Sequence, residues 1–263
     1  MSLLTIPVEL RLRIYDYLPD LQVNNVLQAL TPYSKLTPPV CRVNNVLRHE
    51  TLCVFAANSN FMAFMDDEAL LWSKRLSCWM TGLGSEALSR VRTLQLGRHW
   101  KIPTPMRFQG NVGFYVKVER PKRISMRSAA KAISISSSME SFPAAWSDRF
   151  VSGVQDDGDW VVTAGTYPYS KDLRGMRLES VELLAIHIKT YLIASRGQAA
   201  DDGEIGLKRD DVEFIIQAMD IIASHPISTY QLTTTGSSTE QQQQTWSAMS
   251  RKLSALSRET LIP

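Results

Sequence analysis

The side chains best suited to metal binding or catalysis are scattered along this sequence. The four histidines have neither an H-x-x-x-H spacing nor paired cysteines nearby, so they predict no zinc site; they are His49, His99, His187 and His225. Two acidic runs, at 156–159 and 201–204, lack the twelve-residue ligand spacing of a calcium loop and are interpreted as turns. No nucleophile elbow, phosphate-binding loop or dinucleotide-binding glycine motif occurs. We therefore expect no catalytic site, no cofactor and no bound metal.

The composition allows a sizeable core but does not favour a polyanionic partner. The chain has 263 residues, 44% of them hydrophobic, and a net charge of +3. That length suits one large domain or a small module joined to a medium one. A local basic run stands out, made of Lys117, Arg120, Lys122, Arg123, Arg127 and Lys131. We interpret it as a solvated loop rather than a phosphate-binding surface or a nuclear signal, and we do not expect nucleic acid as a partner.

The cysteines and the apolar runs indicate an intracellular protein. Cys41, Cys53 and Cys78 are odd in number and have no C-x-x-C spacing, which predicts buried thiols in a reducing compartment. The first residues do not follow the pattern of a secretory signal. No run reaches the roughly 18 to 20 apolar residues of a membrane span. We expect no membrane association and a cytoplasmic or nuclear location.

The first 60 residues have the pattern of a small helical module. Pro7 suits the first turn of a helix, because that position needs no amide donor. Leu10, Ile14 and Leu18 recur every fourth residue and form one apolar stripe, and the helix should end before Pro19. We expect a second short helix over 23–30 and a third that begins near Pro39 and runs past residue 55.

The remainder, 61–263, predicts a mixed body. A helical pattern over 61–80 is followed by punctuating glycines, Gly82 and Gly84, and by a helical turn that leads into a strand over 87–96. Further strands are expected at 114–118, 160–164 and 227–232, helices at 178–196, 210–224 and 239–258, and irregular segments at 120–145 and 233–244. The fold class is therefore α+β: an N-terminal helical module, then a body with a small sheet and flanking helices.

The N-terminal pattern resembles a known family. The segment Ile6-Pro7-Val8-Glu9-Leu10-Arg11, with Ile14, Tyr15 and Tyr17-Leu18, is similar to the Leu-Pro-x-Glu-Leu opening of F-box domains, with Ile6 in place of the leucine. The Glu-Leu-Arg-x-x-Ile-Tyr form is closer to the F-box-like proteins of filamentous fungi. A second block matches in the same order, with Val40-Cys41-Arg42, Glu50, Phe55 and Asn60-Phe61. The usual tryptophan after that block is absent, and residues 43–46 stand there instead.

This resemblance implies an F-box-like hook that binds the Skp-type adaptor of a cullin–RING ubiquitin ligase. The body would then select an unknown client protein, and the chain would act as a non-catalytic adaptor in ubiquitin conjugation rather than as an enzyme. By the same resemblance, the partner-binding residues are Ile6, Pro7, Leu10, Ile14, Leu18 and Val40.

Three alternatives stay open at this point. The same residues could pack onto the body as ordinary core, because amphipathic helices commonly do so. The chain could be a stand-alone interaction or regulatory protein that has the hook but no ligase partner. It could also be an enzyme with a dispersed site.

Overall fold

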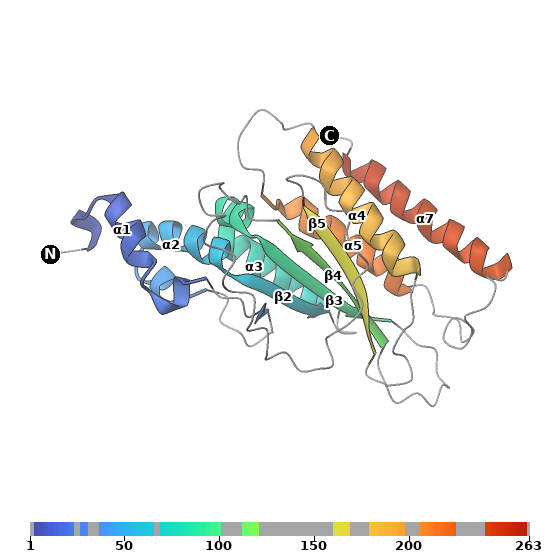
Figure 1. The fold of residues 1–263 in the computed structure, drawn as a ribbon, viewed down its shortest axis with the longest axis horizontal. Coiled ribbons are helices and arrows are strands. Elements are labelled where there is room, and N and C mark those ends of the chain that lie inside the picture. Colours follow the sequence, from blue (N-terminus) through green and yellow to red (C-terminus); the bar gives the residue numbers. More distant parts are fainter. Residues whose placement is uncertain are drawn as a thin grey trace, which may run out of the picture.

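The computed structural model describes residues 3–23, 27–30, 37–65, 69–100, 112–120, 160–168, 179–197, 206–224 and 240–261. It confirms the α+β class, with a five-stranded sheet and helices packed against it (Figure 1). The strands lie side by side in chain order: β1 (Leu27–Ala29), β2 (Asn60–Met65), β3 (Thr93–His99), β4 (Val112–Glu119) and β5 (Val161–Pro168).

The sheet is mixed, and its two halves follow different connection rules. β1, β2 and β3 are parallel, whereas β3, β4 and β5 are antiparallel. Parallel neighbours need a long crossover. Helix α2 (Asn45–Asn58) lies in the first crossover, and α3 (Ala69–Arg90) forms the second. In register, Phe61, Leu94, Val118 and Val162 make one row across four strands, and all four are buried.

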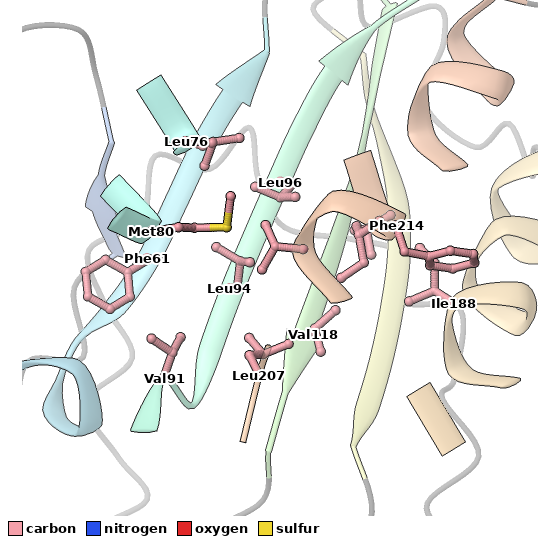
Figure 2. Close-up of a cluster of buried hydrophobic side chains, with 14 of the residues drawn as sticks. Phe61, Leu76, Met80, Val91, Leu94, Leu96, Val118, Ile188, Leu207 and Phe214 are labelled. Carbon is pink, nitrogen blue, oxygen red and sulfur yellow. The ribbon is translucent and has the colours of Figure 1, made fainter. Parts of the chain in front are cut away.

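Helices cover one face of this sheet. Helix α4 (Glu179–Gly197) packs on β5, and α5 (Arg209–Ser224) packs on β3. Figure 2 shows Leu76 and Met80 from α3, Ile188 from α4 and Phe214 from α5 gathered against Leu94, Leu96 and Val118 of the strands. The buried hydrophobic side chains form one continuous core, which extends from Tyr15 to Leu253. Burial of this apolar surface is the main force that holds the layers together.

The C-terminal helix α7 (Glu240–Leu261) belongs to the body. It contacts both α4 and α5, with Met249 and Leu253 buried and Leu256 partly buried against the core. The predicted apolar side of the 239–258 helix is confirmed at these three positions. The Trp246 side chain lies outside the described part.

Parts of two predicted helices are strands. Residues 27–29 of the expected 23–30 helix form β1, which pairs with Asn60, Phe61 and Met62 of β2. Residues 60–65 form β2, with Phe61, Ala63 and Met65 buried in alternation, and the helical pattern begins only at residue 69. In both places pairing with a neighbouring strand overrides the local preference, which is weak in short apolar runs.

The helix expected from Pro39 is broken into two. A short 3-10 helix, η3 (Pro39–Arg42), is followed by α2, whose N-cap is Asn44. The Asn44 side chain accepts a hydrogen bond from the Val46 amide at 2.7 Å. Asparagine is among the best N-cap residues because it satisfies an otherwise unpaired amide, so the helix starts there.

The other predictions have mixed outcomes. The strands at 93–96, 114–118 and 161–164 and the helices near 178–196 and 210–224 are confirmed. The thiols are all free, but Cys78 is exposed and Cys53 only half-buried, so the expectation of three buried thiols was wrong. Segments 121–145, 227–232 and 233–239 lie outside the described residues. Residues 240–244, expected as part of an irregular link over 233–244, belong to α7, so that part of the prediction was wrong. Among the helices described, none is both long and apolar enough to cross a bilayer.

The division of the chain at residue 60 stays a prediction. β1 comes from the first 60 residues and pairs with β2 of the body, so the sheet extends across that division.

Gly82 and Gly84 should respond to substitution in opposite directions. Gly84 has φ 77° and ψ 168°, a region that only glycine adopts readily, and it kinks α3. Gly82 has no such φ, and a Cβ built there meets no heavy atom within 4 Å. We expect Gly84→Ala to lower the free energy of unfolding by about 1–3 kcal/mol. Gly82→Ala should raise it by up to about 1 kcal/mol, the helix propensity difference. Urea unfolding measures both, and equal effects would contradict the kink.

Leu253 should anchor the C-terminal helix. Its side chain is 0% exposed, so Leu253→Ala should lower the free energy of unfolding by about 2–5 kcal/mol through loss of packing. Arg251→Ala, on the exposed side of the same helix, is the matched control and should change stability by less than about 0.5 kcal/mol. Truncation at Thr239 should be more destabilising than Leu253→Ala. An unchanged urea midpoint after truncation would mean that α7 is not part of the core.

Candidate partner-binding surface

The N-terminal segment is built from three short helical pieces. These are η1 (Leu3–Thr5), α1 (Val8–Tyr15) and η2 (Pro19–Leu21). Pro7 is the N-cap of α1, with φ −52° and ψ 146°, and Glu9 lies in the first turn, where its charge suits the helix dipole. The helix ends at Tyr15, one turn earlier than Pro19 requires.

Helix α1 is inverted relative to an ordinary surface helix. Its two buried side chains are Arg11 and Tyr15, which lie one turn apart on the side that faces α2. Leu10 and Ile14, also one turn apart, are 49% and 38% exposed. A globular surface helix normally buries its apolar stripe and exposes its charges. Here Arg11 and Tyr15 make the contact with the body, and the apolar side chains are exposed together with Glu9 and Arg13.

One carboxylate accounts for this orientation. Glu50 of α2 accepts a hydrogen bond from Arg11 Nε at 3.0 Å and a second from Arg11 Nη2 on its other oxygen. The Tyr15 hydroxyl donates to the same carboxylate at 2.7 Å. Arg11 also donates to the Ile6 carbonyl, which ties the chain before the helix to the same point. A two-point arginine–carboxylate contact fixes both distance and direction, so α1 has a defined position on α2.

Hydrogen bonds and burial in this network shift the pKa values of Glu50 and Tyr15. The Arg11 hydrogen bond is the main cause that lowers the pKa of Glu50, and the Tyr15 hydroxyl adds to it. Burial, followed by the contact with Glu50, raises the pKa of Tyr15 to about 12. Because the pKa of Glu50 is lowered on folding, its stabilising effect is complete above the ordinary glutamate range. That effect is lost as the pH falls through the lowered value, so the network is intact at neutral pH.

Helix α2 is the frame that holds this segment. Leu47, Leu52 and Phe55 anchor it in the core. At its far end, Asn58 Nδ2 donates to the Leu21 carbonyl at 2.9 Å, which fixes η2 as Glu50 fixes α1. The two contacts are eight residues apart on one helix.

Exposed apolar side chains are concentrated in the first 46 residues, and we call this set the N-terminal surface. It consists of Leu4, Val8, Leu10, Leu12, Ile14, Tyr17, Val23, Val43 and Val46. Among the described residues, only two other large hydrophobic side chains are exposed, and both are in α4. A local concentration of this kind is typical of a protein-binding site, because single exposed hydrophobics are otherwise spread over a surface.

The predicted partner-binding residues divide into two groups. Pro7, Leu10 and Ile14 are exposed, so for them packing into the core is excluded. Ile6 is half-buried, and Leu18 and Val40 are partly buried and pack against the core. The expected Leu10–Ile14–Leu18 stripe is thus split, because the helix stops before Leu18.

Sequence reasoning did not identify the network that positions the surface. Arg11, Tyr15 and Glu50 were noted only as matches to a family pattern. The four-residue spacing of an arginine and a tyrosine, set against the apolar positions, was the available signal. The exposure of Val43, Val46 and Tyr17 was not predicted either. In the described ranges, no group of three or more histidine, cysteine, aspartate or glutamate side chains could hold a metal ion.

Comparison with known proteins adds no relative. No family model matches the chain, and no curated protein or solved structure is significantly similar to it. The resemblance to F-box-like proteins is therefore still a prediction.

The two tyrosines of this segment provide a matched test of the network. Tyr15→Phe removes the hydroxyl that donates to Glu50 and should lower the free energy of unfolding by about 1.5–3 kcal/mol, the usual value for a hydrogen bond to a charged group. Tyr17 is 81% exposed, so Tyr17→Phe should have no measurable effect. Guanidinium unfolding of both variants decides the point. Equal stability of the two would mean that the Tyr15–Glu50 contact does not hold α1 in place.

Proposed function

We propose that this chain is a non-catalytic adaptor whose N-terminal surface docks another protein. The observation that supports this most directly is the inverted helix α1, which uses Arg11 and Tyr15 to reach the body and leaves Leu10 and Ile14 in solvent. A helix that is only part of a core has no reason to expose its apolar side chains. A partner with an apolar groove would bury them.

The hydrogen bonds of Arg11 and Tyr15 to Glu50 hold the N-terminal surface in place before a partner binds. Because α1 is held before the partner arrives, little conformational entropy is lost on docking. Leu10 and Ile14 lie one turn apart on the same side of a short, fixed helix, which suits insertion into a groove. Leu18 and Val40 are partly buried and pack against the core, which leaves part of each side chain to meet a partner.

The partner that we propose is the Skp-type adaptor of a cullin–RING ubiquitin ligase. This choice rests on the resemblance of residues 6–18 and 40–61 to F-box-like proteins. On this proposal the body binds the client, and the chain works in the cytoplasm or the nucleus, where such ligases act.

Charge substitutions on the surface test the docking. Purified full-length chain is titrated with the Skp-type adaptor, and complex formation is followed by isothermal titration calorimetry. Leu10→Glu and Ile14→Glu should each weaken binding by about a hundredfold or more, because a carboxylate would be placed in an apolar contact. Both side chains are exposed in the free protein, so urea unfolding should be nearly unchanged.

Ile186→Glu is the matched control, since it makes the same change at an isoleucine that is 62% exposed in α4. It should leave adaptor binding intact. Absence of binding by the unmodified chain would refute the ligase assignment and favour the stand-alone interaction protein. Binding that survives both Leu10→Glu and Ile14→Glu would place the docking face elsewhere.

A further inference from the structure

Two arginines occupy partner positions at one end of the sheet. The Arg120 amide donates to the Arg92 carbonyl at 2.8 Å, which extends the β3–β4 ladder by one residue. Side chains alternate along a strand, so Arg92 lies on the same side as Leu94, and Arg120 on the same side as Val118. Leu94 and Val118 are register partners on the face that the helices cover (Figure 2). The two guanidinium groups therefore leave neighbouring strands on the same side of the sheet.

A tryptophan and a helix border this pair. Trp160 is the next position across the sheet from Arg120, because it directly precedes Val161, the register partner of Glu119. Its ring is buried, and the guanidinium carbon of Arg196 in α4 lies 4.7 Å from the ring centroid. Both arginines of the pair are half-buried. Water therefore screens their charges less than it would on an open surface.

Two carboxylates at this end of the molecule have other partners. Asp211 is 2% exposed, accepts from the Lys208 amide at 2.8 Å and pairs with Arg196 at 3.5 Å. Glu119 pairs with Lys117, and by alternation both lie on the opposite side of the sheet. Within the described part of the chain, neither arginine of the pair has a hydrogen bond or ion pair through its side chain. Like charges directly opposite each other on a sheet are destabilising, and an anion between them would remove that cost.

We propose that Arg92 and Arg120 bind the phosphate group of a phosphate ester. Partner positions of a hydrogen-bonded antiparallel pair are about 5.5 Å apart, and each guanidinium can present two parallel N–H groups to an oxyanion. A phosphate ester has three acceptor oxygens and close to two negative charges, so it can bridge both groups and neutralise both. A carboxylate has one charge, which a single arginine neutralises. Of the basic run in the sequence, this site uses Arg120 alone.

Calorimetric titration of the full-length chain with methyl phosphate at constant ionic strength tests the site. Arg92→Ala and Arg120→Ala should each weaken binding by about tenfold or more. Arg92→Lys keeps the charge but loses the fork of donors, so it should weaken binding as well. The matched control is Arg251→Ala combined with Arg258→Ala, which removes two exposed charges from α7 and should leave binding unchanged. Sodium acetate should bind far more weakly than methyl phosphate.

Unfolding without phosphate separates a binding site from a structural role. Arg120→Glu should raise the urea midpoint, because an unlike pair across the strands replaces a like pair. The same variant should lose methyl phosphate binding completely. Arginines that only supported the fold would give the reverse, a lower midpoint for Arg120→Glu.

The proposal is overturned if methyl phosphate does not bind, if acetate binds as tightly, or if the Arg92 and Arg120 variants bind normally. Vesicles that contain phosphatidic acid distinguish two sources of the phosphate. Sedimentation of the chain with these vesicles, lost in Arg92→Ala, would assign the phosphate to a lipid headgroup, whereas no sedimentation would assign it to a free ester. This site goes beyond the proposed docking function. None of its variants changes the N-terminal surface, so the adaptor titration is decided separately.

Discussion

The carboxylate of Glu50 decides which way the first helix faces. It accepts from Arg11 on both oxygens and from Tyr15 on one, and in doing so it holds the side of α1 that carries these two residues against α2. The exposure of Leu10 and Ile14 follows from this orientation, because they lie on a different side of the same short helix from Arg11 and Tyr15. A partly buried ion pair of this kind is rarely a strong source of net stability, since both charges lose water. Its value here is directional: it selects one of several ways in which an eight-residue helix could lie on α2.

The other constraint is the mixed sheet, which brings distant parts of the chain into a single core. The parallel half places α2 and α3 in its crossovers, and the antiparallel half is closed by α4 and α5. α7 then covers α4 and α5 as an outer layer. This order leaves exposed apolar side chains in two places within the described residues, at the N-terminal segment and on α4.

Much of the body could be predicted from periodicity, and the failures have a common cause. The helices α4, α5 and α7 have long apolar stripes, and such stripes identify helices well. β1 and residues 61–65 were wrongly expected to be helical because short apolar runs fit either pattern until a neighbouring strand is known. At the candidate site, the spacing of Leu10 and Ile14 predicted an apolar stripe, and their partner-binding role came from the family resemblance. The role of Glu50 was not, because its partners lie 35 and 39 residues earlier, and single-sequence patterns do not register such contacts.

One short connection joins the N-terminal segment's frame to the sheet. Helix α2 ends at Asn58 and β2 begins at Asn60, so a single residue, the buried Ser59, joins the frame of the N-terminal surface to the central sheet. Such a short junction is a rigid connection rather than a flexible linker, because one residue leaves little room for the two parts to move relative to each other. In the proposed complex, a client bound to the body would have a fixed orientation and a fixed distance relative to the ligase. The set of client lysines that meet the ubiquitin-charged enzyme would then be determined by the angle at Ser59.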